Sequence, residues 1–267
     1  MDYAGIDIGS TAAKVYVRRE GSEDKDIRFV IPTGWSSRNA VRQIEERLLA
    51  EGVDVRNKEK VRTASTGYGR QAVDFADDAI TEITCHGRGG RELAGGDCTV
   101  IDVGGQDTKV ICLKNGSVAD FLMNDKCAAG TGKFVEIMAN RLNLDIPELF
   151  ELAAVGTVIP ISSLCTVFAE SEVISFIGAG RCREDIAAGI ADSVASKVAS
   201  MSQKKKVDKK VILTGGLSQN PYFAKLLGEK LGRDVIVRSA APYAGALGAS
   251  LLEQEKHNRR NRRKADR

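Results

Sequence analysis

The chain has 267 residues, 43% of them hydrophobic and 28% charged, which is ordinary for a globular protein and long enough for one large domain or two of moderate size. No apolar run is long enough to cross a membrane, and the N-terminus, MDYAGIDIGS, lacks the basic and apolar segments of a signal peptide, so we expect a cytoplasmic protein that binds no membrane. The net charge of +3 is uneven, because the last twelve residues carry +6 and the rest of the chain −3.

The first predicted element is a β-hairpin. Residues 3–8, YAGIDI, form a strand pattern that ends at Gly9-Ser10-Thr11, and AAKVYVRR resumes a strand pattern directly afterwards. A helix is expected over 38–52, where apolar residues recur at helical spacing.

The hairpin pattern returns in CTVIDVGGQDTKVICLKNG, residues 98–116. In both copies an Asp ends the first strand, a glycine turn follows, and a Lys opens the second strand. The segments GIDIGSTAAKVYV and VIDVGGQDTKVIC therefore predict an internal duplication, which decides the architecture.

Helical patterns follow the second hairpin over 130–144, 184–201 and 243–256. Residues 209–232 are typical of a buried strand, a Gly-Gly turn and a helix. Strands and helices mixed in two matching halves predict an α/β protein with two lobes.

Glycine turns of this kind expose backbone N–H groups that bind phosphate oxygens. One such turn is equally an ordinary hairpin, but two matching turns, each beside an Asp that can hold Mg²⁺ through water, indicate a phosphate site. A third signal is LTGGLSQNP, residues 213–221, where Gly215-Gly216 lets a flat ring approach the backbone. The alternative interpretation of residues 213–221 is an ordinary turn between a strand and a helix. The sequence has no Walker A motif, which disfavours a P-loop enzyme.

These three segments, in this order, resemble the phosphate-1, phosphate-2 and adenosine motifs of the actin, hexokinase and heat-shock chaperone ATPase superfamily. The resemblance implies two ribonuclease-H-like lobes with ATP in the interdomain cleft. We place the first lobe at residues 1–95, completed by a C-terminal helix at about 244–256, and the second lobe at 96–243. Residues 257–267 are expected to be a disordered basic tail.

Six cysteines without a secretory signal do not indicate a disulfide framework, and no CxxC pair is present. Cys127, in NDKCAAGTGKF, and Cys165, in ISSLCTVFAESEVISFI, are both predicted at helix starts, where backbone N–H groups and the helix dipole favour a thiolate ligand. The alternative for each is a packed core cysteine. Two ligands per chain cannot fill a four-thiolate site, whereas a two-fold dimer can.

The other four cysteines are interpreted more simply. Cys98 and Cys112 lie in apolar strand patterns and are expected in the core, while Cys182 is a loop or helix-start residue without a partner. Cys85 and His86 have no matching ligand nearby in the sequence, so packing or a hydrogen-bonding role is favoured over a metal site.

Together, NDKCAAGTGKF, SSLCTVFAESEVIS and GIDIGSTAAK resemble the ATP-dependent activators, or archerases, of 2-hydroxyacyl-CoA dehydratases, which belong with the benzoyl-CoA reductase ATPase subunits. The resemblance covers residues 3–252. It implies a homodimer that shares one [4Fe–4S] cluster, binds ATP or ADP with Mg²⁺, receives an electron from reduced ferredoxin or flavodoxin, and delivers it to the dehydratase component as ATP is hydrolysed. Closure of the lobes on ATP would then move the helix that follows Cys127.

The resemblance also implies roles for single residues. Cys127 and Cys165 are the expected cluster ligands. Asp7 and Asp102 are expected to hold Mg²⁺ and orient water, with Asp102 the better general base. Glu82 is expected to face the cleft and is the third catalytic candidate. The expected nucleotide contacts are Gly9, Ser10, Thr11, Ala12, Ala13 and Lys14 in the first turn, Gly104, Gly105 and Gln106 in the second, Gly130, Thr131 and Gly132 before the helix, and Gly215, Gly216, Gln219 and Tyr243 around the adenosine.

Two rival functions share this fold: a small-molecule kinase and a non-redox ATPase switch. Neither gives a reason for two cysteines at helix starts. For the basic tail, nucleic-acid binding is disfavoured because no aromatic or groove-reading element accompanies it, and docking to an acidic partner stays an open alternative.

Overall fold

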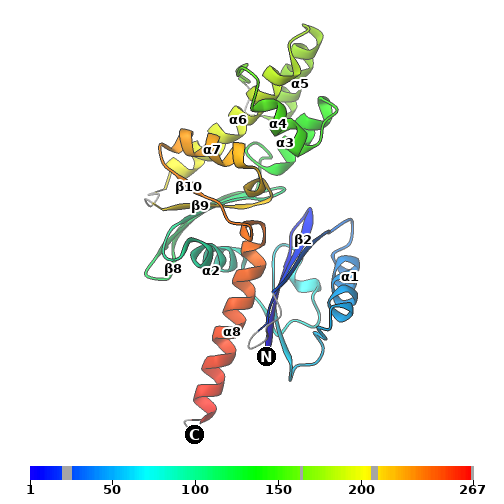
Figure 1. The fold of residues 1–267 in the computed structure, drawn as a ribbon, viewed down its shortest axis with the longest axis vertical. Coiled ribbons are helices and arrows are strands. Elements are labelled where there is room, and N and C mark those ends of the chain that lie inside the picture. Colours follow the sequence, from blue (N-terminus) through cyan, green and yellow to red (C-terminus); the bar gives the residue numbers. More distant parts are fainter. Residues whose placement is uncertain (20–25, 163–164, 206–209, 266–267) are drawn as a thin grey trace. The chain divides into compact units, whose positions relative to one another are not determined.

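The computed structural model describes residues 1–267 except 20–25, 163–164, 206–209 and 266–267, and it divides into two compact units (Figure 1). The first unit comprises residues 1–97, 113–118 and 242–267, and the second comprises residues 98–112 and 119–241. Among the described residues, no helix combines the length and the apolar character that a membrane span requires.

The first unit is built on a five-stranded sheet in the order β3-β2-β1-β4-β5. Strands β1, β2 and β3 are antiparallel neighbours, whereas β4 is parallel to both β1 and β5. The strands are β1 (Asp2–Ile8), β2 (Ala12–Arg19), β3 (Ile27–Pro32), β4 (Val61–Thr66) and β5 (Asp78–Ala79), and the α-helices are α1 (Ser37–Ala50), α2 (Glu82–Ala94) and α8 (Ala244–Ala265).

Helix α1 covers the sheet of the first unit with an apolar stripe. Ser36 caps its N-terminus by accepting a hydrogen bond from the backbone amide of Asn39. Ile44 and Leu48 are fully buried in one cluster with Ile6 and Val15 of the sheet. The periodicity over 38–52 therefore predicted this helix correctly.

Glycines allow helix α8 to approach its neighbours closely. A Cβ on Gly5 of β1 would lie 1.8 Å from the carbonyl oxygen of Ala246, and one on Gly89 of α2 would lie 1.9 Å from that of Ala244. Gly248 of α8 meets Cys85 of α2 in the same way. These contacts fix α8 against both β1 and α2, beside the end of β1 that carries Asp7.

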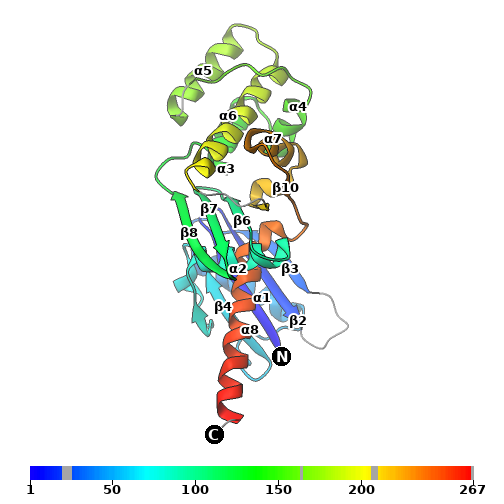
Figure 2. The same ribbon diagram turned by 90° about the vertical axis from the view of Figure 1, so that its left-hand side faces the viewer.

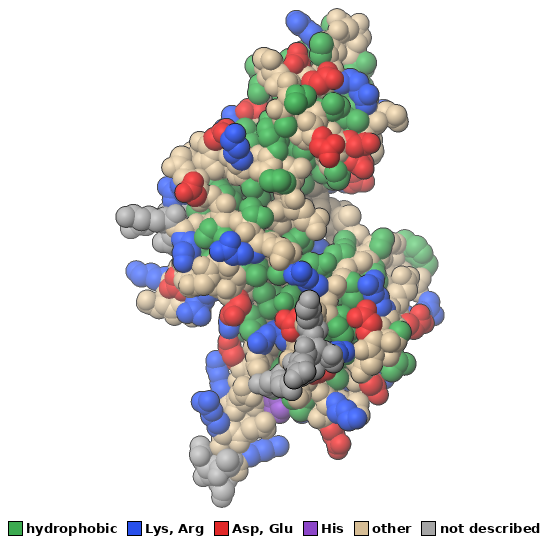
Figure 3. Space-filling view, viewed as in Figure 1, with side chains coloured by type: hydrophobic (Ala, Val, Ile, Leu, Met, Phe, Trp, Pro, Cys, Tyr) green, Lys and Arg blue, Asp and Glu red, His purple; other side chains and the backbone are tan. Residues whose placement is uncertain are grey.

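The basic tail differs from the expectation. Helix α8 continues through Ala265 rather than ending near residue 256, and its last turns carry the Lys and Arg side chains visible in blue at the C-terminal end in Figure 3. Lys256 pairs with Asp78, and His257 contacts the hydroxyl of Tyr3 at 3.0 Å, so the first residues of this segment bind to the unit. Cations near a helix C-terminus also complement its dipole, which favours the continued helix.

The second unit repeats the topology of the first. Its sheet has the order β10-β9-β6-β7-β8, so β6 and β7 correspond to β1 and β2, and β9 corresponds to β4. Figure 2 shows β6, β7 and β8 side by side in this sheet. The strands are β6 (Thr99–Val103), β7 (Thr108–Lys114), β8 (Ser117–Asn124), β9 (Val211–Gly215) and β10 (Val235–Ile236). The predicted duplication and the α/β class are confirmed.

The α-helices among the described residues of the second unit are α3 (Gly132–Arg141), α4 (Ile146–Ala153), α5 (Thr166–Gly178), α6 (Arg183–Gln203) and α7 (Pro221–Leu231). All of them pack with β6 and β9 into one core, to which α5 contributes the fully buried Ala169 and Val173. Helix α5 also has an exposed apolar face, formed by Val167, Phe168, Ile174 and Ile177.

Candidate functional site

The first glycine turn connects β1 to β2 and is supported by its own backbone. The amide of Gly9 donates to the carbonyl of Ala12 at 3.2 Å, and the hydroxyl of Thr33 donates to the carbonyl of Gly9 at 2.7 Å. Ser10 and Thr11 are exposed at its tip, while the side chain of Ala13 is buried in the core. Of the predicted contacts here, Ala13 can therefore offer a ligand only its backbone.

Lys14 is directed toward this turn. A Cβ on Gly9 would lie 3.6 Å from Nζ of Lys14, so the ammonium group sits beside the backbone of the turn. In the strand register Lys14 is paired with Asp7, yet no ion pair of Lys14 is found among the described residues. Its charge is therefore available to an anion at the turn.

Asp7 is buried at the end of β1 and is enclosed on both sides. Glycines leave room for its carboxylate, because a Cβ on Gly67 would lie 2.6 Å from Oδ1 and a Cβ on Gly245 would lie 2.6 Å from Oδ2. Nε2 of His86, also buried, lies 3.7 Å from Oδ2. His86 is therefore packed beside the carboxylate of Asp7, at a separation longer than a hydrogen bond.

Glu82 is the first residue of α2, where an acidic side chain complements the helix dipole. It is half-buried and lies close enough to influence Cys85, whose pKa is raised to about 12 by burial and by the negative charges of Asp7 and Glu82. Glu82 and Asp7 therefore belong to one acidic neighbourhood within the first unit, whereas Cys85 is an inert, buried thiol.

The second glycine turn connects β6 to β7 and is bonded to the start of α3. The amide of Gly104 donates to the carbonyl of Asp107 at 2.9 Å. The amide of Gly132 donates to the carbonyl of Gly104 at 2.9 Å, and that of Lys133 donates to Gly105 at 2.7 Å. The structure thus brings the predicted residues 104–105 and 130–132 together, and leaves Gln106 exposed at the tip.

Asp102 is the last residue but one of β6 and is almost fully buried among polar partners. The hydroxyl of Thr214, on β9, donates to its Oδ1 at 2.7 Å, and Nζ of Lys109 lies 3.5 Å from its Oδ2. Lys109 is itself buried and lies 2.7 Å from Asp107. A carboxylate beside an ammonium group stays ionised, which is the form that binds a cation or orients water.

The residues that the sequence predicted around the adenosine fall in both units. Gly215 has a φ of +82°, and a Cβ there would lie 2.2 Å from the carbonyl of Val103, so glycine is required. Gly216 and Gln219 are exposed, and Gln219 lines a groove of about 960 Å³ along α7. Tyr243 instead belongs to the first unit, where its ring lies 6.4 Å from that of Tyr16.

The cysteines fall into two groups. Cys85, Cys98 and Cys112 are buried, as expected for core residues, and Cys127, Cys165 and Cys182 are exposed. Cys165 is the N-cap of α5 and Cys182 is the N-cap of α6. All three exposed thiols lie in the second unit.

The prediction that Cys127 sits at a helix start is wrong. It lies in the loop between β8 and α3, and the N-cap of α3 is Thr131, because Gly130 takes a φ of +85° that a helix cannot continue. Asn124 holds this loop by donating from its side-chain amide to the carbonyls of Cys127 at 2.8 Å and Ala129 at 3.1 Å. The loop, rather than the helix dipole, presents this thiol.

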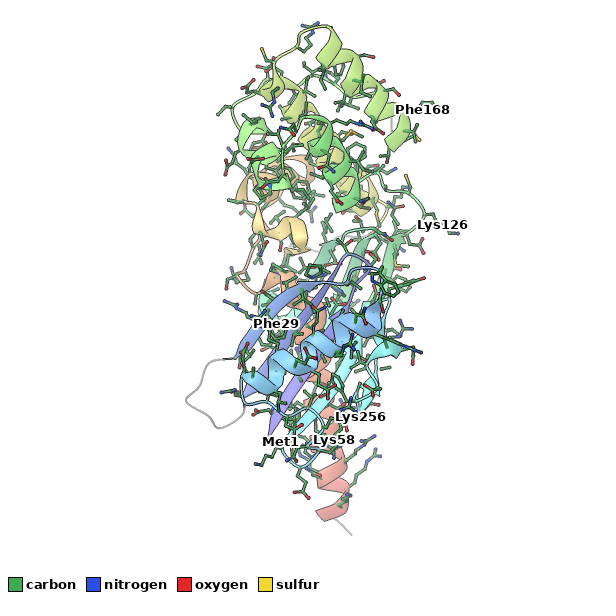
Figure 4. The ribbon with its side chains drawn as sticks, turned by 90° about the vertical axis from the view of Figure 1, so that its right-hand side faces the viewer. Met1, Phe29, Lys58, Lys126, Phe168 and Lys256 are labelled. Atoms are coloured by element: carbon green, nitrogen blue, oxygen red, sulfur yellow. The ribbon has the colours of Figure 1, made fainter. Side chains whose placement is uncertain are left out.

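Within the described residues, no group of three His, Cys, Asp or Glu side chains forms a metal site. Figure 4 shows Lys126 and Phe168, which neighbour the two cysteine segments, projecting outward on the same side of this unit.

Several residues around the two aspartates were not assigned roles from the sequence: Asp107, Lys109, Thr214, Gly67 and Gly245. Lys109 could have been found, because it repeats Lys14 in the duplicated hairpin. Thr214 and Gly245 carry no local signal, since each reaches its aspartate only through the tertiary fold.

The two duplicated sheets, each with an aspartate and a glycine turn at the same position, define the ATPase fold of the actin and hexokinase superfamily. A ROK family glucokinase from Streptomyces griseus, 16% identical with a TM-score of 0.58 over 96% of this chain and 100% of that one, has a similar fold. Residues 4–252 match the BadF/BadG/BcrA/BcrD ATPase family, and the chain belongs to that family.

Relatives with assigned roles are similar over nearly their whole length. The (R)-2-hydroxyglutaryl-CoA dehydratase activating ATPase of Acidaminococcus fermentans is 42% identical over 94% of this chain and 96% of its own. A structure of the activator of the 2-hydroxyisocaproyl-CoA dehydratase from Clostridium difficile, with bound ADPNP, is 37% identical and has a TM-score of 0.90 over 98% of both chains. The activator of lactoyl-CoA dehydratase from Anaerotignum propionicum is 41% identical over 94% of this chain and 96% of its own.

Proposed function

We propose that this protein hydrolyses ATP to ADP and phosphate and couples hydrolysis to the delivery of one low-potential electron to a 2-hydroxyacyl-CoA dehydratase or a related CoA-ester reductase. The main support is that a family of ATPases with dehydratase activators among its members matches this chain over 4–252, and that both duplicated aspartates keep polar, buried surroundings. The electron donor would be reduced ferredoxin or flavodoxin.

Nucleotide binding is supported by the two glycine turns. Backbone amides of the turns and the ammonium group of Lys14 would bind phosphate oxygens, and Asp7 and Asp102 would hold Mg²⁺ through water. We assign Asp102, ionised beside Lys109, to orient the attacking water, because positioning and charge stabilisation are the main protein contributions to phosphoryl transfer. Gly215, Gly216 and Gln219 would contact the adenosine, and Tyr243 of the first unit would complete its surroundings.

The exposed thiols of Cys127 and Cys165 fit a shared cluster. Thiolates are the ligands that iron–sulfur clusters prefer, and both lie on the second unit with exposed apolar side chains of α5 nearby in sequence. Two chains in a two-fold dimer would supply four thiolates to one [4Fe–4S] cluster. When bound, such a cluster would supply a one-electron reductant, and the chain's own contribution is to present the two thiols.

Iron analysis of anaerobically purified protein tests the cluster assignment. We expect close to four irons per two chains, with loss of iron and brown colour in Cys127→Ser and Cys165→Ser. Cys182→Ser is the matched control, because Cys182 is also an exposed thiol at a helix start and should keep both signals. Four irons per single chain, or loss of iron in the control alone, would contradict the shared site.

The electron-transfer function is tested with a purified dehydratase component, a reduced donor and ATP. We expect dehydratase activity to appear only when all three accompany this protein, and ADPNP to support binding without repeated turnover. A protein that phosphorylates a small molecule while leaving the dehydratase inactive would instead be a kinase of the same fold.

A further inference from the structure

The two halves of the duplication carry equivalent lysines that are placed differently. Aligning GIDIGSTAAK with VIDVGGQDTK pairs Asp7 with Asp102 and Lys14 with Lys109. In both hairpins the lysine lies directly opposite the aspartate in the strand register. Sequence and backbone alone therefore give the two lysines the same starting position.

Their side chains nevertheless have different partners. Nζ of Lys109 lies 2.7 Å from Asp107 and 3.5 Å from Asp102, and its side chain is 4% exposed. Lys14 is half-buried, with Nζ beside the backbone of Gly9 and without an ion pair among the described residues. Lys109 is therefore paired with carboxylates, whereas the ammonium group of Lys14 lies beside the first glycine turn.

A single position in the alignment explains this difference. Asp107 stands where the first hairpin has Ala12. Its carboxylate fills the second turn, since a Cβ on Gly104 would lie 2.5 Å from Oδ1 of Asp107, and its Oδ2 reaches Lys109. Ala12 has no charged group with which to hold Lys14.

Burial stabilises the ion pairs of Lys109 with Asp102 and Asp107. A buried ammonium group requires a paired anion, and removing it would leave two neighbouring carboxylates without a counter-charge. Lys109 therefore cannot leave Asp102 and Asp107 to bind a ligand at low cost. Lys14 has no such ion pair among the described residues, so its ammonium group can bind an anion.

We propose that Asp107 is a positioning residue that fixes Lys109 as the permanent counter-cation of Asp102, so that Lys14 alone of the two duplicated lysines binds nucleotide phosphate. The assignment of Lys14 to phosphate rests on the proposed ATPase function, whereas the fixation of Lys109 by Asp107 does not. The two hairpins would thus perform different tasks: the first contributes a mobile cation, and the second an ionised carboxylate in a fixed orientation.

Reductive methylation of lysine amines, followed by peptide mass spectrometry on the full-length protein, tests both the fixation of Lys109 and the binding of phosphate by Lys14. We expect Lys14 to be methylated at least tenfold faster than Lys109, and ADPNP with Mg²⁺ to protect Lys14. In Asp107→Ala, Lys109 should become several-fold more reactive, while Asp107→Glu should restore its protection. Equal labelling of the two lysines in the unaltered protein, or no change at Lys109 in Asp107→Ala, would overturn the proposal.

The reciprocal substitution examines the same idea in the first hairpin. Ala12→Asp should hold Lys14 in an ion pair, slow its labelling and raise the Kd for ADPNP about tenfold above that of Ala12→Asn, which adds a polar side chain of nearly the same size without the charge. The melting temperature of each variant shows whether it has folded, so a folded Ala12→Asp with unaltered Kd and labelling contradicts the proposal. If the labelling contrast persists but ADPNP never protects Lys14, the fixation of Lys109 is supported and nucleotide binding at the first turn is contradicted.

Discussion

The backbone amide of Gly132 donates a hydrogen bond of 2.9 Å to the carbonyl oxygen of Gly104, which fixes the first residue of α3 to the second glycine turn. The loop that carries Cys127 ends at this point, and the hydroxyl of Thr108 bonds the carbonyl of Gly130 at 2.7 Å to the same hairpin. A phosphate bound at the turn can therefore act on the loop that presents Cys127 through two hydrogen bonds and no intervening element.

Gly132→Ala should weaken this connection. An added Cβ would lie 3.1 Å from the carbonyl of Gly104 and 3.5 Å from Cα of Gly105, so the turn and the start of α3 must separate by a few tenths of an ångström. We expect ATP-dependent activation of the dehydratase to fall more than ATP hydrolysis does, measured side by side. Gly178→Ala is the control, because nothing lies within 4 Å of a Cβ there. Equal losses in both activities would argue against a coupling role for this contact.

Asp102→Asn should retain nucleotide binding and lose most hydrolysis. The amide keeps the shape and can still accept from Thr214, but it removes the charge that orients water, and losses of roughly 10²–10⁴-fold are typical for groups that assist proton transfer. Steady-state hydrolysis and ADPNP affinity measure the two effects separately. Asp120→Asn, at an exposed carboxylate paired with Lys205, should leave hydrolysis unchanged. Unaltered hydrolysis in Asp102→Asn would remove Asp102 from the mechanism.

Truncation of the C-terminal helix should depend sharply on where the cut is made. Removing residues 258–267 keeps Lys256, labelled in Figure 4, on Asp78 and His257 on Tyr3, so stability and hydrolysis should be close to those of the full chain. Removing residues 256–267 eliminates both contacts and should lower the free energy of unfolding by about 1–2 kcal/mol. Thermal unfolding of the two truncated proteins compares them directly, and equal melting temperatures would show that these contacts contribute nothing.

Stability should fall as the pH rises from about 4.5 to about 7 because of Glu253. Burial, followed by its hydrogen bond with Asp78, raises the pKa of Glu253 to about 7 in the folded protein. The folded state therefore keeps a proton that the unfolded state has already released, so stability is lost as the pH rises through the folded pKa. Lys256, on Asp78, and Asp77, paired with Lys58 and Arg62, are the other charges around this group.

Glu253→Gln should remove this pH dependence. The amide cannot ionise, so at pH 8 the variant should be more stable than the unaltered protein by on the order of 1–2 kcal/mol, after allowance for screening by solvent, and the difference should shrink toward pH 5. Denaturant unfolding at a series of pH values measures this. Parallel profiles for the two proteins would show that Glu253 titrates normally.

The duplication and the chemistry of its turns could be predicted from the order of the amino acids alone. Alternation and helical spacing are local properties, so the strands around Asp7 and Asp102 and the helices α1 and α6 could be predicted from periodicity alone. Helix α4 was missed although Asp145 and Glu148 form a capping box with Pro147 at the helix start, which is a readable signal. Strand β4 was missed because it pairs with β1 over a long separation in sequence.

The partner of each duplicated residue, in contrast, depends on the three-dimensional fold. Lys14 and Lys109 occupy the same position in the repeat, yet the carboxylate of Asp107 draws one inward and leaves the other at its turn. Thr214 reaches Asp102, and Gly245 makes room for Asp7, from residues more than a hundred positions away. Hydrogen bonds and close packing of this kind depend on three-dimensional distance, which the order of residues along one strand does not specify.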